Sequence, residues 1–251
     1  MTGSLPTIVA HRGFPERFPE NTLLGIEAAI KAGAKAIEFD VQMSFDKIPI
    51  LFHDDTLNRM TGIDGTVMDM PLTDLIRLSA HYPERFGDKY IGTRVSSLAQ
   101  FVEFMQDYRE IIIFVEIKEE SLRHFGCRIM MDKVFEDLKP IREQCIIISF
   151  DKNALEYCRE TDFAPTNWVV RKYNEQSRAI AEALQPDYLC CKIQKVFDHG
   201  HDLWPGNWQW MLYETNDPQL VMQCFAAGAH FVETDNIGEL LPRIKESAYG
   251  L

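Results

Sequence analysis

Short apolar runs alternate with helix-like segments along almost the whole chain, and this alternation constrains the fold more than any other feature. The clearest run, Ile111–Ile117, is nearly unbroken in aliphatic and aromatic residues, as expected of a parallel strand covered on both faces. Strands that alternate with helices predict βα units and a parallel sheet. The predicted strands are Thr7–Ala10, Lys35–Met43, Ile48–Phe52, Ile111–Ile117, Cys145–Phe150, Asn167–Arg171, Tyr188–Cys191, Trp210–Glu214 and His230–Glu233.

The number of strands favours a closed barrel. About eight strands within about 250 residues are typical of a (β/α)8 TIM barrel, and a doubly wound open sheet is the alternative. Polar residues recur at the carboxyl ends of several predicted strands, which is where barrel enzymes place their sites. We therefore predict an α/β fold with a single catalytic barrel domain over residues 1–251.

One stretch, residues 54 to 90, breaks this rhythm. It contains turn-rich and helical pieces, punctuated by Gly62, Gly65 and Pro71, and lacks a strongly apolar strand. Within it, Leu72–Leu78 is expected to form a short helix. We predict a small inserted subdomain after the second strand region that walls one side of a site; a loop without function is the alternative.

The first full helix is predicted to follow the first strand. Asn21 is placed as its N-cap, the helix extends to Ala32, and Gly33 is placed to end it. The loop between strand and helix then carries the segment His11–Gly13.

Composition and charge exclude several classes of partner. The net charge is −12 and basic residues do not cluster, which disfavours nucleic-acid binding. No run approaches the roughly 18 apolar residues that span a bilayer, so stable membrane insertion is not expected. Residues 1–6 hold neither a basic segment nor an apolar core, so we expect no signal peptide. A monomer or a homodimer is expected.

The cysteines lack zinc-type or redox-type spacing. Several lie in apolar runs, where a free cysteine behaves as a small hydrophobic residue. They are therefore expected to be reduced core residues of a cytoplasmic protein. The cysteines are Cys127, Cys145, Cys158, Cys190, Cys191 and Cys224.

Carboxylates on two predicted strands share a face, because residues two apart in a strand point the same way. Glu38 and Asp40 would point into the barrel mouth from one strand, and Glu116 from another, with Lys118 one step nearer the rim. Buried, unpaired carboxylates cost several kcal/mol each and need a cation. All-oxygen ligation suits Mg²⁺ or Ca²⁺. The alternative is a set of structural ion pairs, such as Glu38 with Lys118.

Two histidines each end an apolar run beside a charged residue. His11 is followed by Arg12, and His53 by Asp54. A histidine pair can divide acid and base catalysis, one taking a proton from the nucleophile and the other giving one to the leaving oxygen. Arg12 offers a two-point contact to a phosphoryl group, and Gly13 permits a tight turn or a close backbone approach. A capped structural histidine is the alternative for either ring alone.

These residues, in this order and spacing, resemble those of the glycerophosphodiester phosphodiesterases over nearly the whole chain, and most of all the small cytoplasmic bacterial members. The matching motifs are His11-Arg12-Gly13 with Pro19-Glu20-Asn21-Thr22, Glu38-Phe39-Asp40-Val41, Asp46 with Pro49, His53-Asp54 with Leu57, Arg59 and Thr61, and Glu116-Ile117-Lys118.

The resemblance implies a role for each of these residues. It implies a (β/α)8 barrel with a subdomain inserted after the second histidine. Glu38, Asp40 and Glu116 would hold one divalent cation, Mg²⁺ or Ca²⁺. The general acid/base pair would be His11 and His53. Arg12 and Lys118 would contact the phosphate, and Asn21 would support the first histidine loop.

The last third of the chain departs from the family pattern. The family's Trp-Thr-Val-Asn reads Tyr213-Glu214-Thr215-Asn216, with Trp210 nearby, so Tyr213 and Trp210 are the candidate aromatic substrate contacts. The family's Gly-Ile-Ile-Thr-Asp reads Phe231-Val232-Glu233-Thr234-Asp235, in which Glu233 is unusual and could point into the barrel.

The predicted function is metal-dependent hydrolysis of a small glycerophosphodiester to glycerol 3-phosphate and an alcohol. Either water or the glycerol 2-hydroxyl could be the nucleophile, and the second would give a cyclic phosphate. The alternatives are a lysophospholipase D acting on longer lipids, a cyclising phospholipase, and a non-catalytic module that binds phosphorylated ligands. Retention of both histidines argues against the module, because a binder needs no proton relay.

Overall fold

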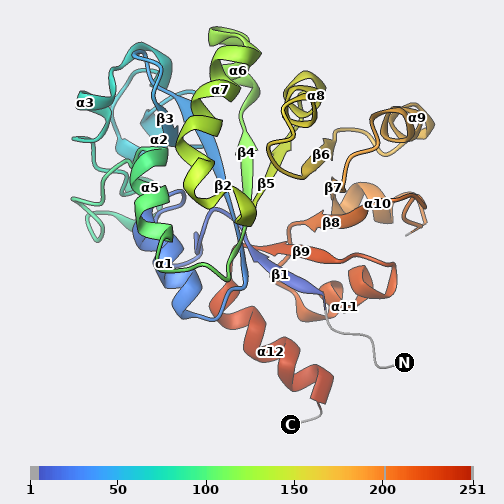
Figure 1. Ribbon diagram of the computed structural model, residues 1–251. Coiled ribbons are helices and arrows are strands. Elements are labelled where there is room, and N and C mark those ends of the chain that lie inside the picture. The colour runs from blue at the N-terminus through green and yellow to red at the C-terminus, as the bar shows by residue number, and fades with distance from the viewer. Residues whose placement is uncertain (1–5, 201, 250–251) are drawn as a thin grey trace.

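Eight parallel strands close into a barrel, which confirms the predicted fold class. The computed structural model describes residues 6–200 and 202–249, so the expectation about a signal peptide lies largely outside the described residues. Helices surround the barrel, and most follow the strands in turn (Figure 1). The barrel strands are β1 Thr7–Ala10, β2 Ala36–Met43, β4 Ile112–Ile117, β5 Cys145–Ser149, β6 Thr166–Val170, β7 Tyr188–Lys192, β8 Gln209–Tyr213 and β9 Phe231–Thr234.

The ring closes because β1 pairs with both its sequence neighbour and the last strand. Val9 lies opposite Ala36 of β2 on one side and opposite Glu233 of β9 on the other. The remaining strands follow in sequence order around the barrel. All eight carboxyl ends therefore open at the same end of the barrel.

The predicted strand Ile48–Phe52 has a different role from the others. It forms β3, Pro49–Leu51, which pairs antiparallel with β2 outside the ring. The reversal follows from a tight turn in which Ser44 donates its N–H to the Ile48 carbonyl and Lys47 takes a positive φ of 62°. A reversal this short can join only antiparallel strands. This strand therefore extends the sheet beside β2 and is not one of the eight barrel strands.

The outer helices pack on the alternate, apolar face of the strands. Ile37 and Val41 point outward into this layer, and Phe39 meets Phe101 of α5 with ring centroids 4.3 Å apart. The main helices are α1 Leu23–Lys31, α5 Leu98–Met105, α6 Glu119–Phe125, α7 Cys127–Leu138, α8 Lys152–Glu160, α9 Glu175–Leu184, α10 Ile193–Phe197, α11 Pro218–Ala226 and α12 Ile237–Tyr249, with the 3-10 helix η2 at Lys139–Gln144. No helix in the described part of the chain is long and apolar enough to cross a membrane.

A second apolar cluster fills the inside of the barrel below the site. Phe114 and Phe231 meet edge to face with centroids 5.3 Å apart, and Met211 and Val9 complete the same layer. Burying each such side chain contributes about 1.5–3 kcal/mol. This packed floor supports the polar side chains that project one step further along the same strands.

Helix α1 begins one residue later than predicted, since Thr22 rather than Asn21 is its N-cap. The Thr22 hydroxyl accepts the Gly25 N–H at 3.1 Å. Asn21 takes a positive φ of 53°, which turns its side chain away from the helix end. The asparagine is thereby free to contact β2.

The segment between β2 and α5 folds around a small core of its own. Its helices lie together on one side of the barrel (Figure 1). Leu57, Met60 and Leu75 are buried there, in a cluster that also includes Ile50 of β3. The elements are α2 Asn58–Thr61, the 3-10 helix η1 Val67–Asp69, α3 Leu72–Leu75 and α4 Pro83–Phe86. The predicted helix Leu72–Leu78 therefore ends three residues early.

Candidate active site

A cavity of about 200 Å³ opens at the carboxyl ends of the barrel strands. It brings together most of the residues that the sequence singled out. The residues that line it are His11, Arg12, Glu38, His53, Glu116, Lys118, Ile148, Phe150, Val169, Cys190, Tyr213, Glu214 and Glu233.

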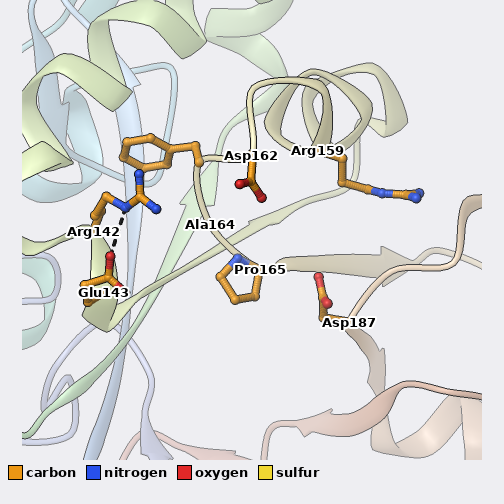
Figure 2. Close-up of a pocket in the computed structure, with 8 residues that line it drawn as sticks. Arg142, Glu143, Arg159, Asp162, Ala164, Pro165 and Asp187 are labelled. Atoms are coloured by element: carbon orange, nitrogen blue, oxygen red, sulfur yellow. Dashed lines mark hydrogen bonds and ion pairs between the residues drawn. The ribbon is translucent and has the colours of Figure 1, made fainter.

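A larger cavity of about 450 Å³ lies at the opposite end of the barrel, among the segments that lead into β5, β6 and β7 (Figure 2). Several of its charged side chains already have partners. Arg142 pairs with Glu143, Arg159 donates to the Leu184 carbonyl, and Asp187 accepts the Thr166 N–H. The polar groups that converge on one point are those at the carboxyl ends of the strands, and we take that cavity as the site.

Three carboxylates converge there as the strand alternation predicts. Glu38, Asp40 and Glu116 each offer an oxygen, and these oxygens lie within 4.8 Å of one another. Their strands are neighbours in register, with Asp40 directly opposite Glu116. Such a set of clustered oxygens matches the ligands that Mg²⁺ and Ca²⁺ prefer.

Asp40 is held on several sides. Asn21 donates its Nδ2–H to Asp40 Oδ2 at 2.8 Å, and Asn21 Oδ1 accepts the Asp40 N–H at 3.0 Å. Lys118 Nζ and Arg12 Nε each lie 3.2 Å from the carboxylate. Burial by itself would raise the pKa of Asp40, but these two cations hold it well below its usual range. Asp40 is therefore ionised and held in a fixed orientation.

Glu38 has the opposite electrostatic environment. It is buried and accepts the Arg12 backbone N–H at 3.0 Å. Burial first, and then the neighbouring Asp40 charge, raise its pKa well above the usual value. His11, whose Nε2 lies 3.9 Å away, lowers this pKa without offsetting the other influences, and a divalent cation would add positive charge beside Glu38. The donor set therefore fits a hard divalent metal ion.

His11 is oriented from the last strand. Its Nδ1 lies 2.7 Å from Asp235 Oδ1, and its Nε2 lies 3.9 Å from Glu38 Oε2. Burial and the Arg12 charge lower the pKa of His11, but the bond to Asp235 and the nearby Glu233 and Glu38 outweigh them and raise it to about 10. His11 can therefore carry a proton in the cavity.

His53 is oriented in the same manner from the inserted segment. Its Nδ1 lies 2.6 Å from Asp54 Oδ1, and its backbone carbonyl accepts an N–H from Gln42 at 3.1 Å. Asp54 is itself bonded to Arg59. In both histidines a carboxylate holds Nδ1, so Nε2 is the atom that remains for a ligand.

Gly13 makes the close backbone approach that the sequence suggests. It has a φ of +90°, and a Cβ at this position would lie 2.9 Å from both Gly25 C and Ile26 N. The loop after β1 is thereby pressed against the start of α1. Asn21 adds a bond from its N–H to the Arg12 carbonyl at 3.1 Å, which supports the predicted role of Asn21 in holding this loop.

The two predicted aromatic contacts divide between the faces of β8. Tyr213 lines the cavity, and burial raises its pKa above the ordinary range. Trp210 lies in the layer between barrel and helices, where its Nε1–H donates to the Trp204 carbonyl at 3.0 Å. Residues three apart in a strand point to opposite faces, so Tyr213 and Trp210 cannot both face the cavity. The structure places Tyr213 there and Trp210 on the outer face of β8.

Glu233 lies within the cavity and is buried. Burial raises its pKa to about 8, opposed by the His11 charge and reinforced by Glu116.

The structure also shows contacts that the sequence did not predict. The bonds of Asp235 to His11 and of Arg59 to Glu20 and Asp54 join residues far apart in the chain.

Comparisons with known proteins agree with this geometry. The model of the glycerophosphoryl diester phosphodiesterase family matches residues 11–239, and the chain belongs to this family. A glycerophosphodiester phosphodiesterase of Caldanaerobacter subterraneus is 32% identical over 148 residues, which is 59% of this chain and 59% of that protein. A glycerophosphodiester phosphodiesterase of Bacillus subtilis is 30% identical over 187 residues, which is 71% of this chain and 56% of that protein. The chain thus matches less than two thirds of the length of either relative.

Solved structures show the same fold over nearly the whole chain. A phosphodiesterase of Oleispira antarctica, solved with the product sn-glycerol-3-phosphate, has a TM-score of 0.82 and 26% identity, covering 96% of this chain and 97% of that one. A glycerophosphodiester phosphodiesterase of Thermotoga maritima has a TM-score of 0.73 and 22% identity, covering 96% and 99%.

Proposed function

We propose that this protein hydrolyses small glycerophosphodiesters to glycerol 3-phosphate and an alcohol, with one divalent cation and two histidines. The observation that supports this most is the placement of His11 and His53 around the cavity that Glu38 and Glu116 also line, with the Asp40 carboxylate clustered beside those two. Family membership and the product bound by the Oleispira antarctica relative point to the same reaction class.

Glu38, Asp40 and Glu116 would hold the cation. When bound, Mg²⁺ or Ca²⁺ would polarise a phosphoryl oxygen and lower the pKa of a hydroxyl group beside it. Asn21 and Lys118 keep Asp40 in place for this role, as their bonds to its two oxygens indicate. Such contacts orient a carboxylate as the outer-shell hydrogen bonds of known metal sites orient the metal ligands.

His11 and His53 would move the protons through Nε2. Asp235 and Asp54 occupy the Nδ1 side of the two rings, which fixes ring orientation. One ring would accept the proton of the attacking hydroxyl group and the other would protonate the leaving alcohol oxygen. His11, with its raised pKa, suits the proton-donating role.

Arg12 and Lys118 would bind the phosphoryl group. Burial lowers the pKa of each side chain, but neighbouring carboxylates, Asp40 most of all, raise it. Both pKa values therefore lie above the ordinary range. Fixed cations that face a developing negative charge stabilise the transition state. Tyr213 would form part of the wall against the glycerol or the alcohol.

All six cysteines are free thiols and five of them are buried. Unpaired buried cysteines suit a reducing compartment, so we propose the cytoplasm.

The test is release of glycerol 3-phosphate from glycerophosphocholine, measured for the wild type, His11→Ala and His53→Ala. We expect turnover by the wild type and a loss of about 10²–10⁴-fold in each variant, with metal binding largely kept. A lysophospholipid offered in the same assay separates a lysophospholipase D. Near-normal rates in both variants would remove the proton-transfer roles, and binding without turnover would indicate a binding module.

A further inference from the structure

Arg59 of the inserted segment makes two two-point ion pairs with one guanidinium group. Its Nε and Nη2 donate to the two oxygens of Asp54 at 2.6 and 3.0 Å. Its Nη1 and Nη2 donate to the two oxygens of Glu20 at 2.9 and 2.7 Å. The guanidinium carbon also lies 5.1 Å from the ring centre of Tyr82. Arg59 is therefore fixed from three directions.

These bonds belong to a continuous chain that ends at the two sides of the cavity. On one side, Asp54 contacts His53 Nδ1 at 2.6 Å. On the other, Glu20 Oε1 accepts Arg12 Nη1–H at 3.1 Å. Arg12 Nε in turn lies 3.2 Å from Asp40 Oδ2. A single side chain thus joins the histidine of one loop to the arginine of another.

The joined groups come from separate parts of the fold. Arg12 and Glu20 lie in the loop between β1 and α1, and His53 and Asp54 follow β3. No strand of the barrel carries His53 itself, since β3 lies outside the ring. The backbone of His53 is held to β2, where Gln42 donates to its carbonyl at 3.1 Å. Arg59 adds a side-chain tie between Asp54, which holds the His53 ring, and the loop that carries Arg12.

The chemistry of the contact requires arginine. A guanidinium presents its N–H groups in a planar fork and can bond two carboxylates at two points each. Lysine keeps the charge but is a single donor centre on a flexible stem, and it cannot reproduce this geometry. Glu20 is buried, so the Arg59–Glu20 pair is only weakly screened by salt, whereas the side chains of Arg59 and Asp54 are partly exposed.

We propose that Arg59 is a positioning residue that sets His53 and Arg12 at the correct separation for the phosphodiester. It touches neither reacting atom and acts through Asp54 on one histidine and through Glu20 on the phosphate-binding arginine. This inference rests on the proposed function. The proposal predicts a combined effect, in which loss of Arg59 disturbs proton transfer and phosphate binding together. Loss of Asp54 should disturb mainly proton transfer, and loss of Glu20 mainly phosphate binding.

The experiment compares Arg59→Lys with a matched control, Arg85→Lys. Arg85 also ties the inserted segment to the loop after β1, through Glu16 at 2.7 Å, but contacts neither Asp54 nor Glu20 among the bonds found in the described residues. For glycerophosphocholine we expect Arg59→Lys to lower kcat and raise KM, with kcat/KM down about 10–100-fold. Arg85→Lys should keep wild-type values, and both variants should melt within a few degrees of the wild type.

Two further variants divide the effect. Asp54→Asn should lower kcat more than it raises KM, and Glu20→Gln should raise KM more than it lowers kcat. Adding Glu20→Gln to Arg59→Lys should change KM less than it does in the wild type, because the tie is already lost. Additive changes, wild-type kinetics of Arg59→Lys, or a loss in Arg85→Lys of equal size would overturn the proposal.

A measurement without turnover separates this proposal from the proposed function. In ¹⁵N spectra of the histidine rings, wild-type His53 should show one tautomer, fixed by Asp54, and Arg59→Lys should broaden or split that signal while His11 keeps its own. An unchanged His53 signal in Arg59→Lys overturns the positioning role. If the wild type hydrolyses no glycerophosphodiester but Arg59→Lys still changes the His53 signal, only the proposed function is refuted.

Discussion

Replacing Gly13 by alanine tests how the first histidine loop is held. Two penalties apply to the new Cβ. Non-glycine residues in left-handed backbone conformations cost about 1–2 kcal/mol, and Gly13 has a φ of +90°. The Cβ would also lie 2.9 Å from two backbone atoms of α1, Gly25 C and Ile26 N. Backbone cannot rotate away as a side chain can, and such overpacking costs about 1–3 kcal/mol more.

The expected loss for Gly13→Ala is therefore about 2–5 kcal/mol. In a domain of this size each kcal/mol lowers Tm by about 2–4 °C, so a fall of about 4–20 °C is expected. Relief of the clash must move the loop that carries His11 and Arg12. A displacement near 1 Å costs about 10²-fold in rate, so hydrolysis of glycerophosphocholine should fall by about that factor.

Gly92→Ala is the matched control. Gly92 has nearly the same φ, +93°, but among the described residues, its two chain neighbours aside, no atom lies within 4 Å of the place that a Cβ would take. It should show the backbone penalty alone, about 1–2 kcal/mol, with normal turnover. Calorimetry and the glycerol 3-phosphate assay are run on both variants. Equal melting temperatures and equal rates in the two variants would refute the close-approach argument.

Two other perturbations follow from the buried polar groups. The pKa of Glu233 is raised from 4.5 to about 8, so the native state keeps a proton that the unfolded state loses; stability is then highest below pH 4.5 and falls by up to about 5 kcal/mol as pH rises to about 8. Denaturant unfolding in EDTA at pH 5 and pH 8.5 should show a larger fall in the wild type than in Glu233→Gln, in which the raised pKa of His11 still lowers stability above pH 6.5, and an equal fall in both would contradict it. Asn21→Ala removes the bonds at 2.8 and 3.0 Å that hold Asp40; we expect a stability loss of about 1–3 kcal/mol and metal affinity weaker by about 10–100-fold, checked by calorimetric titration, with wild-type affinity as the opposing result.

The sequence predicted the barrel because its signals are local. The alternation of apolar runs with helices recurs in nearly every unit, and the two-residue period of β2 placed Glu38 and Asp40 on the inner face. The direction of β3 was less accessible, because it depends on a turn at Ser44–Ile48 that carries little apolar pattern. Asn21 resembled a helix cap, since asparagine favours caps, but contact with Asp40 determines its conformation.

The supporting contacts of the site could not be predicted in the same way. Asp235 and His11 are 224 positions apart, and only the closure of β9 onto β1 brings them together. Arg59 and Glu20 are 39 positions apart and meet across an irregular segment. By contrast, the position of Trp210 could have been predicted from the strand period, because its spacing from Tyr213 puts the two rings on opposite faces of β8.

Glu38, Asp40 and Glu116 are proposed to hold one divalent cation on which hydrolysis depends, and every other role at the site is built around that ion. The most direct test is release of glycerol 3-phosphate by EDTA-treated protein as Mg²⁺ or Ca²⁺ is added back, for the wild type and for Glu38→Gln. We expect no turnover after chelation, recovery that saturates with one bound ion per chain in the wild type, and little recovery in Glu38→Gln. Undiminished turnover after EDTA, or equal recovery in the variant, would contradict the proposed metal site.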